Sequence, residues 1–297
     1  MKFILAYPET TGPDGDLLDS GPVGEIALAA ERAGFDGFAL TEHPIPGARW
    51  LSAGGHQTLD PFIGLSFAAA ATTRIRLLTY LTVIPYRNPL LLAKTAASLD
   101  RLSGGRLILG VGTGYQKSEF RALGVDLEER NTLFDEALEV LPLAWSGQPF
   151  SYTGKHFDAR DVIAKPRPAQ DPIPIWIGGN AAITRRRVAE RCQGWMPLGG
   201  TAELSKTTRT PFIESNTELA DQIATMRDAA GARGPSLEVV SGYGVHGSDY
   251  WNETERHREA FAELAAAGVT GVVISSPAGA PPRATDFIAM FGETYVT

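Results

Sequence analysis

IRLLTYLTVIPYRNPLLLAKTAASLDRLSGGRLILGVGTG, at residues 75–114, contains a strand, a helix and a second strand in one continuous stretch. Residues 75–84 are almost all apolar and lack helical periodicity, which is typical of a strand buried on both faces. The Asn-Pro pair at 88–89 predicts a helix start, with Asn as N-cap and Pro in the first helical position. The sequence SGG at 103–105 predicts its end. Residues 106–111 then form the next buried strand, so the stretch predicts a βαβ unit.

The same alternation continues along the chain. The pattern AGxxG followed by apolar residues occurs at 33–40 and 267–274, with a looser version at 192–198. Each is typical of a helix that ends at glycine and leads directly into a buried strand. We predict strands at 2–7, 37–42, 75–84, 106–111, 173–177, 194–198, 237–242 and 271–275, and helices at 22–33, 61–71, 89–102, 127–145, 181–191, 217–230, 253–266 and 284–291. Eight alternations predict a (β/α)8 TIM barrel that occupies residues 1–297 as a single domain.

Four connections between these elements are long: 44–60, 146–172, 199–216 and 243–252. The active site of such a barrel lies on the loops that follow the strands. We therefore expect the first, third and fourth of these segments to form a lid over the site. Within the second, the alternation in FSYTGKHFDA predicts a small hairpin around Thr153-Gly154.

Composition excludes several classes of protein. The net charge of −7 and the pI near 5.3 argue against nucleic acid as a partner, because no basic stripe is present to bind phosphates. The arginine run at 185–187 is interpreted as a solvated helix face. A single cysteine, Cys192, excludes an internal disulfide framework and fits a reducing compartment. No secretion signal or membrane-spanning segment is evident, which predicts a cytoplasmic protein with no membrane partner.

One motif at the predicted end of the second strand could carry acid–base chemistry. Glu42 and His43 lie in the sequence TEHP, where a barrel places its reacting groups. For an isolated dipeptide, a structural histidine held by its neighbours is the favoured explanation, and the position at the end of a strand is the main argument for a catalytic role. The five histidines of the chain show neither HxH nor HExxH spacing, so we predict no metal site.

Two glycine motifs follow later strands. Gly112, Thr113 and Gly114 end the fourth strand, where close backbone packing and phosphate binding are both compatible with the sequence. Residues 178–180 (GGN) end the fifth strand and open a helix, so they predict either an anion site made of backbone N–H groups or a simple turn. Because no nucleophile motif accompanies these loops, the pattern favours a protein that borrows its chemistry from a bound cofactor.

Together, these motifs resemble the luciferase-like family of flavin and deazaflavin barrel enzymes. The similarity rests on TEHP at 41–44, on LTYLTVIPYRNPLLLAKTAASLDRLSGGRLILGVGTGYQKSEFRALGV at 78–125 and on PIPIWIGGN at 172–180. It extends over residues 2–198 and is nearest to the actinobacterial branch that uses coenzyme F-420, a deazaflavin. The resemblance implies an oxidoreductase, a small-molecule substrate and a homodimer.

The resemblance also implies roles for particular residues. His43 would lie near the reactive face of the cofactor ring, with Glu42 beside it. Tyr80 and Leu81 correspond to the place where the family often has a non-prolyl cis peptide behind that ring. The tail of the cofactor carries phosphate. Its border would be formed by Gly112, Thr113 and Gly114. Contacts through N–H groups would come from Gly178, Gly179 and Asn180.

One departure from the family pattern matters. Tyr115 stands where the deazaflavin-dependent sugar-phosphate dehydrogenase has a glutamate acid directly after its GTG. No set of lysines matches the sugar-phosphate grip of that enzyme. The resemblance therefore does not extend to that activity, and either His43 or Tyr115 is expected to relay the proton.

Three functions follow from the resemblance. The first is hydride transfer between coenzyme F-420 and an alkene, ketone, imine or alcohol. The second is an FMN-dependent monooxygenase that receives reduced flavin from a separate reductase. The third is a non-catalytic barrel that only binds a flavin. The identity of the cofactor distinguishes the first two, and turnover separates both from the third.

Overall fold

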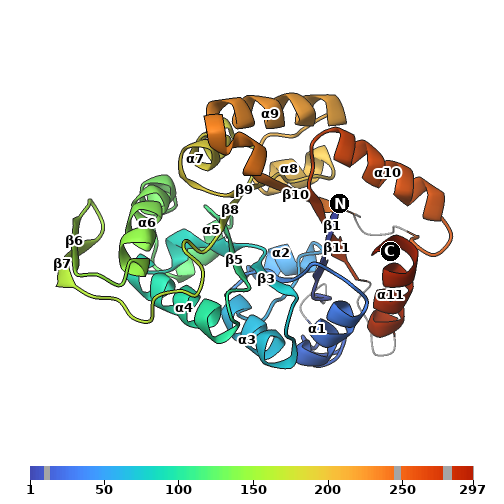
Figure 1. Ribbon diagram of the computed structural model, residues 1–297, viewed down its shortest axis with the longest axis horizontal. Coiled ribbons are helices and arrows are strands. Elements are labelled where there is room, and N and C mark those ends of the chain that lie inside the picture. The colour runs from blue at the N-terminus through green and yellow to red at the C-terminus, as the bar shows by residue number, and fades with distance from the viewer. Residues whose placement is uncertain (10–13, 244–248, 277–282, 297) are drawn as a thin grey trace.

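The computed structural model is a closed ring of parallel strands surrounded by helices, and it describes residues 1–9, 14–243, 249–276 and 283–296 (Figure 1). Each strand pairs in parallel with its neighbours in chain order, and the first pairs with the last, which closes the ring. The predicted TIM barrel is confirmed. Its strands are β1 (Lys2–Ala6), β2 (Gly37–Leu40), β3 and β4 (Arg76–Thr79 and Thr82–Val83, which share one position), β5 (Leu107–Gly112), β8 (Ile175–Gly178), β9 (Gly194–Met196), β10 (Glu238–Tyr243) and β11 (Gly271–Ser275).

The long helices lie where the sequence predicted them. They are α1 (Val23–Arg32), α3 (Pro61–Ala71), α4 (Pro89–Leu102), α6 (Arg130–Trp145), α7 (Ala182–Arg191), α9 (Asn216–Ala229), α10 (Thr254–Ala266) and α11 (Arg283–Phe291). The cap predicted for α4 is present, because Asn88 Oδ1 accepts hydrogen bonds from the N–H groups of Leu90 and Leu91 at 2.9 and 3.4 Å. Three short helices in the long loops were not predicted: α2 (Ala48–Ser52), α5 (Lys117–Ala122) and α8 (Ala202–Thr207).

The single strand predicted at 75–84 is wrong in its second half. The strand ends at Thr79, the Tyr80–Leu81 peptide bond is cis, and a short strand and a 3₁₀ turn follow it. Two hydrogen bonds hold the bulge, one from Tyr80 N to Leu40 O at 2.6 Å and one from Val83 N to a Glu42 carboxylate oxygen at 2.6 Å. An apolar run cannot reveal such a break, since the bulge is held by a residue of the neighbouring strand.

The barrel has two separate apolar layers. The larger one fills the space between strands and helices. The smaller one lies inside the barrel, where Tyr80 and Leu81 pack against it from the bulge; its buried members are Ile4, Ala6, Ala39, Leu78, Ile108, Trp176, Met196, Val240 and Val273. Because side chains fill the interior, any ligand must bind above this layer, at the end of the barrel.

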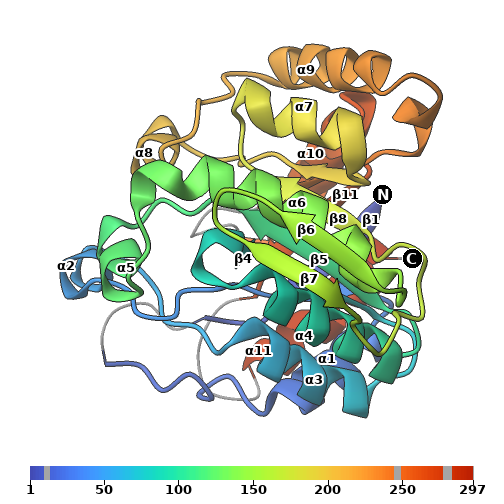
Figure 2. The same cartoon turned by 90° about the vertical axis from the view of Figure 1, so that its left-hand side faces the viewer.

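Two smaller predictions have opposite outcomes. The predicted hairpin is confirmed as β6 (Phe150–Thr153) and β7 (Asp158–Val162), an antiparallel pair on the outside of the barrel (Figure 2). The solvated face predicted for 185–187 is wrong for Arg187, whose side chain is 3% exposed. Its Nε lies 2.7 Å from Asp135 Oδ1, and its guanidinium lies over the ring of Phe134.

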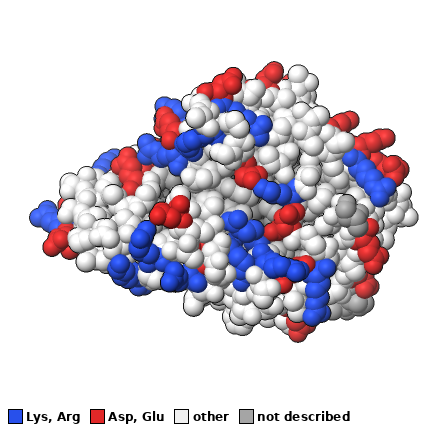
Figure 3. Space-filling view, viewed as in Figure 1, with Lys and Arg blue, Asp and Glu red and all other residues white. Residues whose placement is uncertain are grey.

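The three unpredicted short helices gather at one end of the molecule, opposite the termini (Figure 2). They belong to the loops after β2, β5 and β9, so this is the carboxyl end of the barrel. The predicted lid segment 243–252 falls partly outside the described residues. On the face seen in Figure 3, Lys and Arg side chains form separate groups with acidic side chains among them, rather than one basic surface.

Candidate active site at the carboxyl end of the barrel

His43 follows β2 and is almost fully enclosed, with 9% of its surface exposed. Its backbone N–H donates to Thr58 Oγ1 at 3.1 Å, which ties the strand exit to the far end of the loop at 44–60. This loop carries α2 and returns over the histidine. The structure therefore places His43 at the barrel rim, where the sequence predicted a reacting group.

The nearest partners of His43 come from α5 and were missed by the sequence analysis. Nδ1 lies 3.2 Å from Nε2 of Gln116 and 3.4 Å from Oε2 of Glu119. Glu119 is 1% exposed, and its carboxylate also accepts hydrogen bonds from the Tyr86 hydroxyl at 3.1 Å and from Ile45 N at 3.4 Å. Only its position in the sequence could have indicated Glu119 as a site residue. It is a carboxylate in the first helical turn after GTG, four residues beyond Tyr115.

Three rings surround the imidazole of His43. The ring centroids of Trp50, His56 and Tyr115 lie 4.6, 5.0 and 6.0 Å from it. The first two come from the loop at 44–60, and the third comes from the end of β5. The structure thus brings His43 and Tyr115 together, as their assignment as alternative proton relays requires.

Tyr80 and Tyr115 both remain protonated at neutral pH. Burial raises the pKa of each phenol to about 12, and for Tyr115 the charge of Glu119 acts in the same direction. Neither hydroxyl can serve as a base near pH 7, although each can donate a hydrogen bond. Among the predicted residues, His43 is consequently the group suited to accept a proton.

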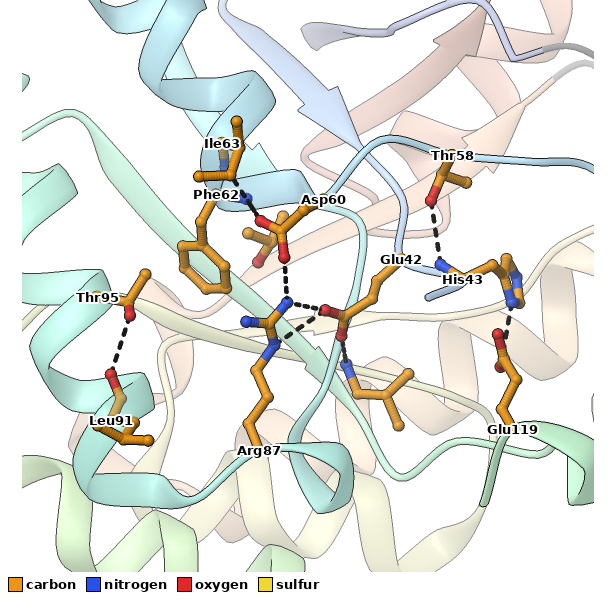
Figure 4. A network of polar contacts seen from close by, with 12 residues as sticks. Glu42, His43, Thr58, Asp60, Phe62, Ile63, Arg87, Leu91, Thr95 and Glu119 are labelled. Carbon is orange, nitrogen blue, oxygen red and sulfur yellow. Dashed lines mark hydrogen bonds and ion pairs between the residues drawn. The ribbon is translucent and has the colours of Figure 1, made fainter. Parts of the chain in front are cut away.

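Glu42 does not lie beside the His43 ring, contrary to the prediction. Figure 4 shows its carboxylate directed toward Arg87 and the His43 ring directed toward Glu119. Glu42 forms an ion pair with Arg87, whose Nε lies 2.9 Å away, and it accepts the hydrogen bond from Val83 N. Burial raises the pKa of Glu42, and Arg87 acts against that rise. Successive residues at the end of a strand point to opposite sides, so Glu42 supports the bulge.

A second carboxylate–imidazole pair lies beside the first and was also missed. Glu9, on the loop after β1, accepts a hydrogen bond from the Thr41 hydroxyl, and its Oε2 lies 3.1 Å from Nε2 of His56. Burial raises the pKa of Glu9 to about 7. The loops after β1 and β2 are thereby joined directly above the barrel.

Gly112 and Gly178 lie side by side beneath Leu81. A Cβ atom added to either glycine would overlap a terminal methyl group of Leu81. A Cβ on Gly114, which has φ of +76°, would meet Val83 and Phe120. Close packing explains these three glycines without a ligand, and their predicted role next to a cofactor stays a prediction, as does that of Thr113.

The donors predicted at the turn after β8 already have protein partners. Gly179 N donates to Met196 O at 3.1 Å, and Asn180 N donates to Thr210 Oγ1 at 2.7 Å. The Asn180 side chain, 2% exposed, donates to Leu198 O and Pro211 O and accepts from Leu198 N. The predicted contact of the Asn180 N–H with a phosphate is therefore not supported, because this N–H already donates to Thr210. The side chain of Asn180 fastens the loop after β9 to the loop after β8.

Charge is unevenly distributed around this end of the barrel. The loop sequences at 7–22, 244–253 and 276–282 contain no Lys or Arg, and the first contains four carboxylates. Basic residues follow other strands of this end: Arg49 after β2, Arg87 after β4, Lys117 and Arg121 after β5, Arg185 after β8, and Lys206 and Arg209 after β9, where Glu203 and Glu214 also lie.

Neither a metal-binding cluster nor a membrane-spanning helix occurs in residues 1–9, 14–243, 249–276 and 283–296. Within those ranges no group of three or more His, Cys, Asp or Glu residues could hold a metal ion. None of the described helices is long and apolar enough to cross a membrane.

Comparison with known proteins gives the family. The model of the luciferase-like monooxygenase family matches residues 1–262. An uncharacterized protein of Mycobacterium tuberculosis is 31% identical over 238 residues, which cover 75% of this chain and 78% of that protein. The solved structure of a monooxygenase from Streptomyces bottropensis covers this chain completely with a TM-score of 0.74 and 22% identity, with 99% of that chain covered in turn.

Two relatives differ in their cofactor. The F420-dependent glucose-6-phosphate dehydrogenase of Segniliparus rotundus is 30% identical over 213 residues, which cover 70% of this chain and 60% of that enzyme. The FMNH(2)-dependent dimethylsulfone monooxygenase of Pseudomonas putida is 28% identical over 247 residues, which cover 82% of this chain and 61% of that enzyme. The chain thus spans less than two thirds of the length of either enzyme.

Proposed function

The chain belongs to the luciferase-like monooxygenase family, and we propose that it is an oxidoreductase that exchanges a hydride between coenzyme F-420 and a small organic substrate. The observation that carries the proposal is the enclosed His43, with Glu119 and Gln116 on one ring nitrogen. Hydride transfer to or from a carbonyl, imine or activated alkene is coupled to the movement of a proton. The relative from Segniliparus rotundus supports the choice of cofactor.

The residues at the barrel mouth suit a flat ring with an anionic tail. Tyr80 and Leu81 form an apolar floor above the interior layer, and His43 with its neighbouring rings forms a wall. The bound deazaflavin would supply or accept the hydride at C5. Arg185, Lys206 and Arg209 place positive charge over β8 and β9, which favours this side for the phosphate-bearing tail.

The acidic side of the mouth remains for the substrate. His43 would hold or release the proton that accompanies the hydride, and the Tyr115 hydroxyl would donate a hydrogen bond to a substrate oxygen or nitrogen. The loop at 44–60, fastened through Thr58 and His56, would exclude water from these groups.

The second candidate is an FMN-dependent monooxygenase that receives reduced flavin from a separate reductase. The relative from Pseudomonas putida favours it and matches a larger share of this chain than the dehydrogenase does. A barrel that binds a flavin without turnover is the third candidate.

A homodimer in the cytoplasm is part of the proposal. Exposed apolar side chains at Ile63, Phe67 and Leu91 on α3 and α4 fit an interface between copies.

Cofactor titration tests the proposal. We expect coenzyme F-420 to quench the protein fluorescence with a lower Kd than FMN, either oxidised or reduced. Micromolar binding of FMN, with no binding of coenzyme F-420, would replace the proposal with the monooxygenase. Binding of either cofactor without turnover over a panel of alcohols, ketones, imines and alkenes would support the third candidate.

A histidine variant then tests the role of His43. His43→Ala should retain the cofactor while kcat falls by about 10²–10⁴-fold, the usual contribution of a positioned acid or base. His156→Ala is the matched control, since that histidine pairs with Glu129 on the surface. A large loss of Tm with unchanged turnover per folded molecule would make His43 structural.

A further inference from the structure

The Nδ1 atom of His43 lies within reach of two partners that make opposite demands on it. Gln116 Nε2 is a donor and needs a lone pair on Nδ1, so it favours the tautomer with the proton on Nε2. The Glu119 carboxylate is an acceptor and needs a proton on Nδ1. The distances of 3.2 and 3.4 Å let either contact form without rotation of the ring.

We propose that Gln116 and Glu119 are positioning residues that compete for Nδ1 and thereby set whether Nε2 of neutral His43 presents a lone pair, as a base requires, or an N–H that only donates a hydrogen bond. When Nδ1–H donates to Glu119, Nε2 presents a lone pair and can accept a proton. When Gln116 donates to Nδ1, Nε2 carries the single ring proton and acts as a hydrogen-bond donor only. His43 gives a proton away from Nε2 only as the imidazolium that forms when Nε2 has accepted one, and its Nδ1–H then still donates to Glu119. This inference rests on the proposed role of His43 as the proton carrier.

The surroundings of Glu119 support this role. Its carboxylate is buried, and among the described residues its hydrogen-bonding partners are neutral apart from His43: the Tyr86 hydroxyl and the Ile45 N–H. A buried carboxylate without an arginine or lysine is costly unless a nearby group can carry positive charge. His43 is that group here, because protonation on both nitrogens gives an imidazolium next to Glu119.

Helix α5 explains why both partners reach one atom. Gln116 is the N-cap residue and Glu119 lies three residues later, so both face the same side of the first turn. The other titratable groups around the ring are Tyr115 from the end of β5, Tyr86 from the 3₁₀ turn after β4 and His56 from the loop at 44–60. Burial and the charge of Glu119 raise the pKa of Tyr86, so it stays a donor to that carboxylate.

The tautomer can be measured without any cofactor or substrate. Protein labelled with ¹⁵N in its histidine rings gives long-range ¹H–¹⁵N spectra that distinguish a protonated nitrogen from one with a lone pair. Only five histidines contribute, and His43→Asn identifies the signals of His43. We expect the wild-type Nδ1 to give a shift between the two extremes, as fast exchange between tautomers requires.

Two variants should move this signal in opposite directions. Glu119→Gln should shift Nδ1 toward the lone-pair form, since the anion that favours a proton on Nδ1 is lost. Gln116→Met removes the amide at nearly constant length and should shift Nδ1 toward the protonated form. Glu129→Gln is the matched control: it changes the His156 signals and leaves those of His43 in place.

A shift of Nδ1 that is equal in the wild type and in both variants would overturn the competition. The NMR result does not depend on whether the protein is an oxidoreductase, so it separates this inference from the proposed function. If turnover is found, the shape of the kcat/KM pH profile should also change in Glu119→Gln and stay unchanged in Glu129→Gln. A uniform loss of rate in Glu119→Gln with an unchanged profile would count against the inference.

Discussion

At the scale of single residues, Glu42 shows how the barrel mouth depends on a buried charge. Arg87 pairs with this carboxylate, and it also binds Asp60 at 2.7 Å and lies over the ring of Phe62 at 5.0 Å. We expect Arg87→Met to lower the free energy of unfolding by about 3–5 kcal/mol, because it leaves a buried carboxylate without its partner. Urea unfolding measures this change. Arg186→Met is the matched control and should have almost no effect, since its pair with Glu190 is exposed.

The loss in Arg87→Met should also depend on pH. Burial raises the pKa of Glu42, and Arg87 is the main opposing influence. Without Arg87, the native carboxyl binds a proton more readily than the unfolded one. The free energy of unfolding of the variant is therefore least reduced below a pH of about 4.5, the pKa of Glu42 in the unfolded chain. It falls further as the pH rises through the pKa of Glu42 in the native variant. An equal loss at pH 5 and pH 8 would show that lost packing, rather than charge, dominates.

At the scale of single elements, two glycines of β5 differ in what stands opposite them. A Cβ on Gly110 would overlap the backbone carbonyl oxygen of Thr79, which cannot move without breaking the sheet. A Cβ on Gly112 would overlap only the end of the Leu81 side chain, which can rotate. We therefore expect Gly110→Ala to lower Tm strongly, and Gly112→Ala to retain most of the Tm while it weakens cofactor binding through a displaced Leu81.

Thermal unfolding and cofactor titration on the two variants check this contrast. The double variant Gly112→Ala with Leu81→Ala is compared with Leu81→Ala alone, because both lack the overlap. The two should bind the cofactor equally well. Equal losses of Tm in Gly110→Ala and Gly112→Ala would mean that Leu81 is as fixed as the backbone. In that case the glycines of β5 would have a purely structural role.

The sequence predicted elements better than it predicted contacts. The Asn-Pro start of α4 and the apolar period of the strands are local features, so the eight strand positions and the long helices could be predicted from them. The break after Thr79 depends on Glu42 from the loop after β2, and the partners of His43 lie 73 and 76 residues away. Such long-range contacts leave no trace in a local pattern. The backbone N–H of Asn180 was similarly assigned to a ligand, although it donates to Thr210 on the next loop.

At the scale of the whole molecule, the loop after β1 brings carboxylates and no Lys or Arg to the mouth of the barrel. Glu9, Asp14, Asp16 and Asp19 lie on the loop after β1, and Glu9 contacts the site through Thr41 and His56. If the cofactor tail occupies the side of β8 and β9, a substrate enters past carboxylates. We expect neutral or cationic substrates to be preferred over anionic ones, and kcat/KM for an anionic substrate to rise with salt as the repulsion is screened.

This prediction can be checked before any substrate is known. Trp50 lies beside His43 and His56, and three of the other tryptophans, at 145, 176 and 195, are buried. In a Trp251→Phe background, Trp50 is therefore the tryptophan most open to a dissolved quencher. Cs⁺ should quench it more efficiently than I⁻ at low salt, with neutral acrylamide as the reference for accessibility. Adding Asp14→Lys and Asp19→Lys should make I⁻ the more efficient quencher, because these substitutions replace two negative charges with positive ones. Both side chains are exposed, so the substitutions change the charge and leave the contacts of the site in place. If iodide quenches better than caesium in the unaltered loop, the acidic sequence after β1 does not set the potential at the mouth, and an anionic substrate becomes the better hypothesis.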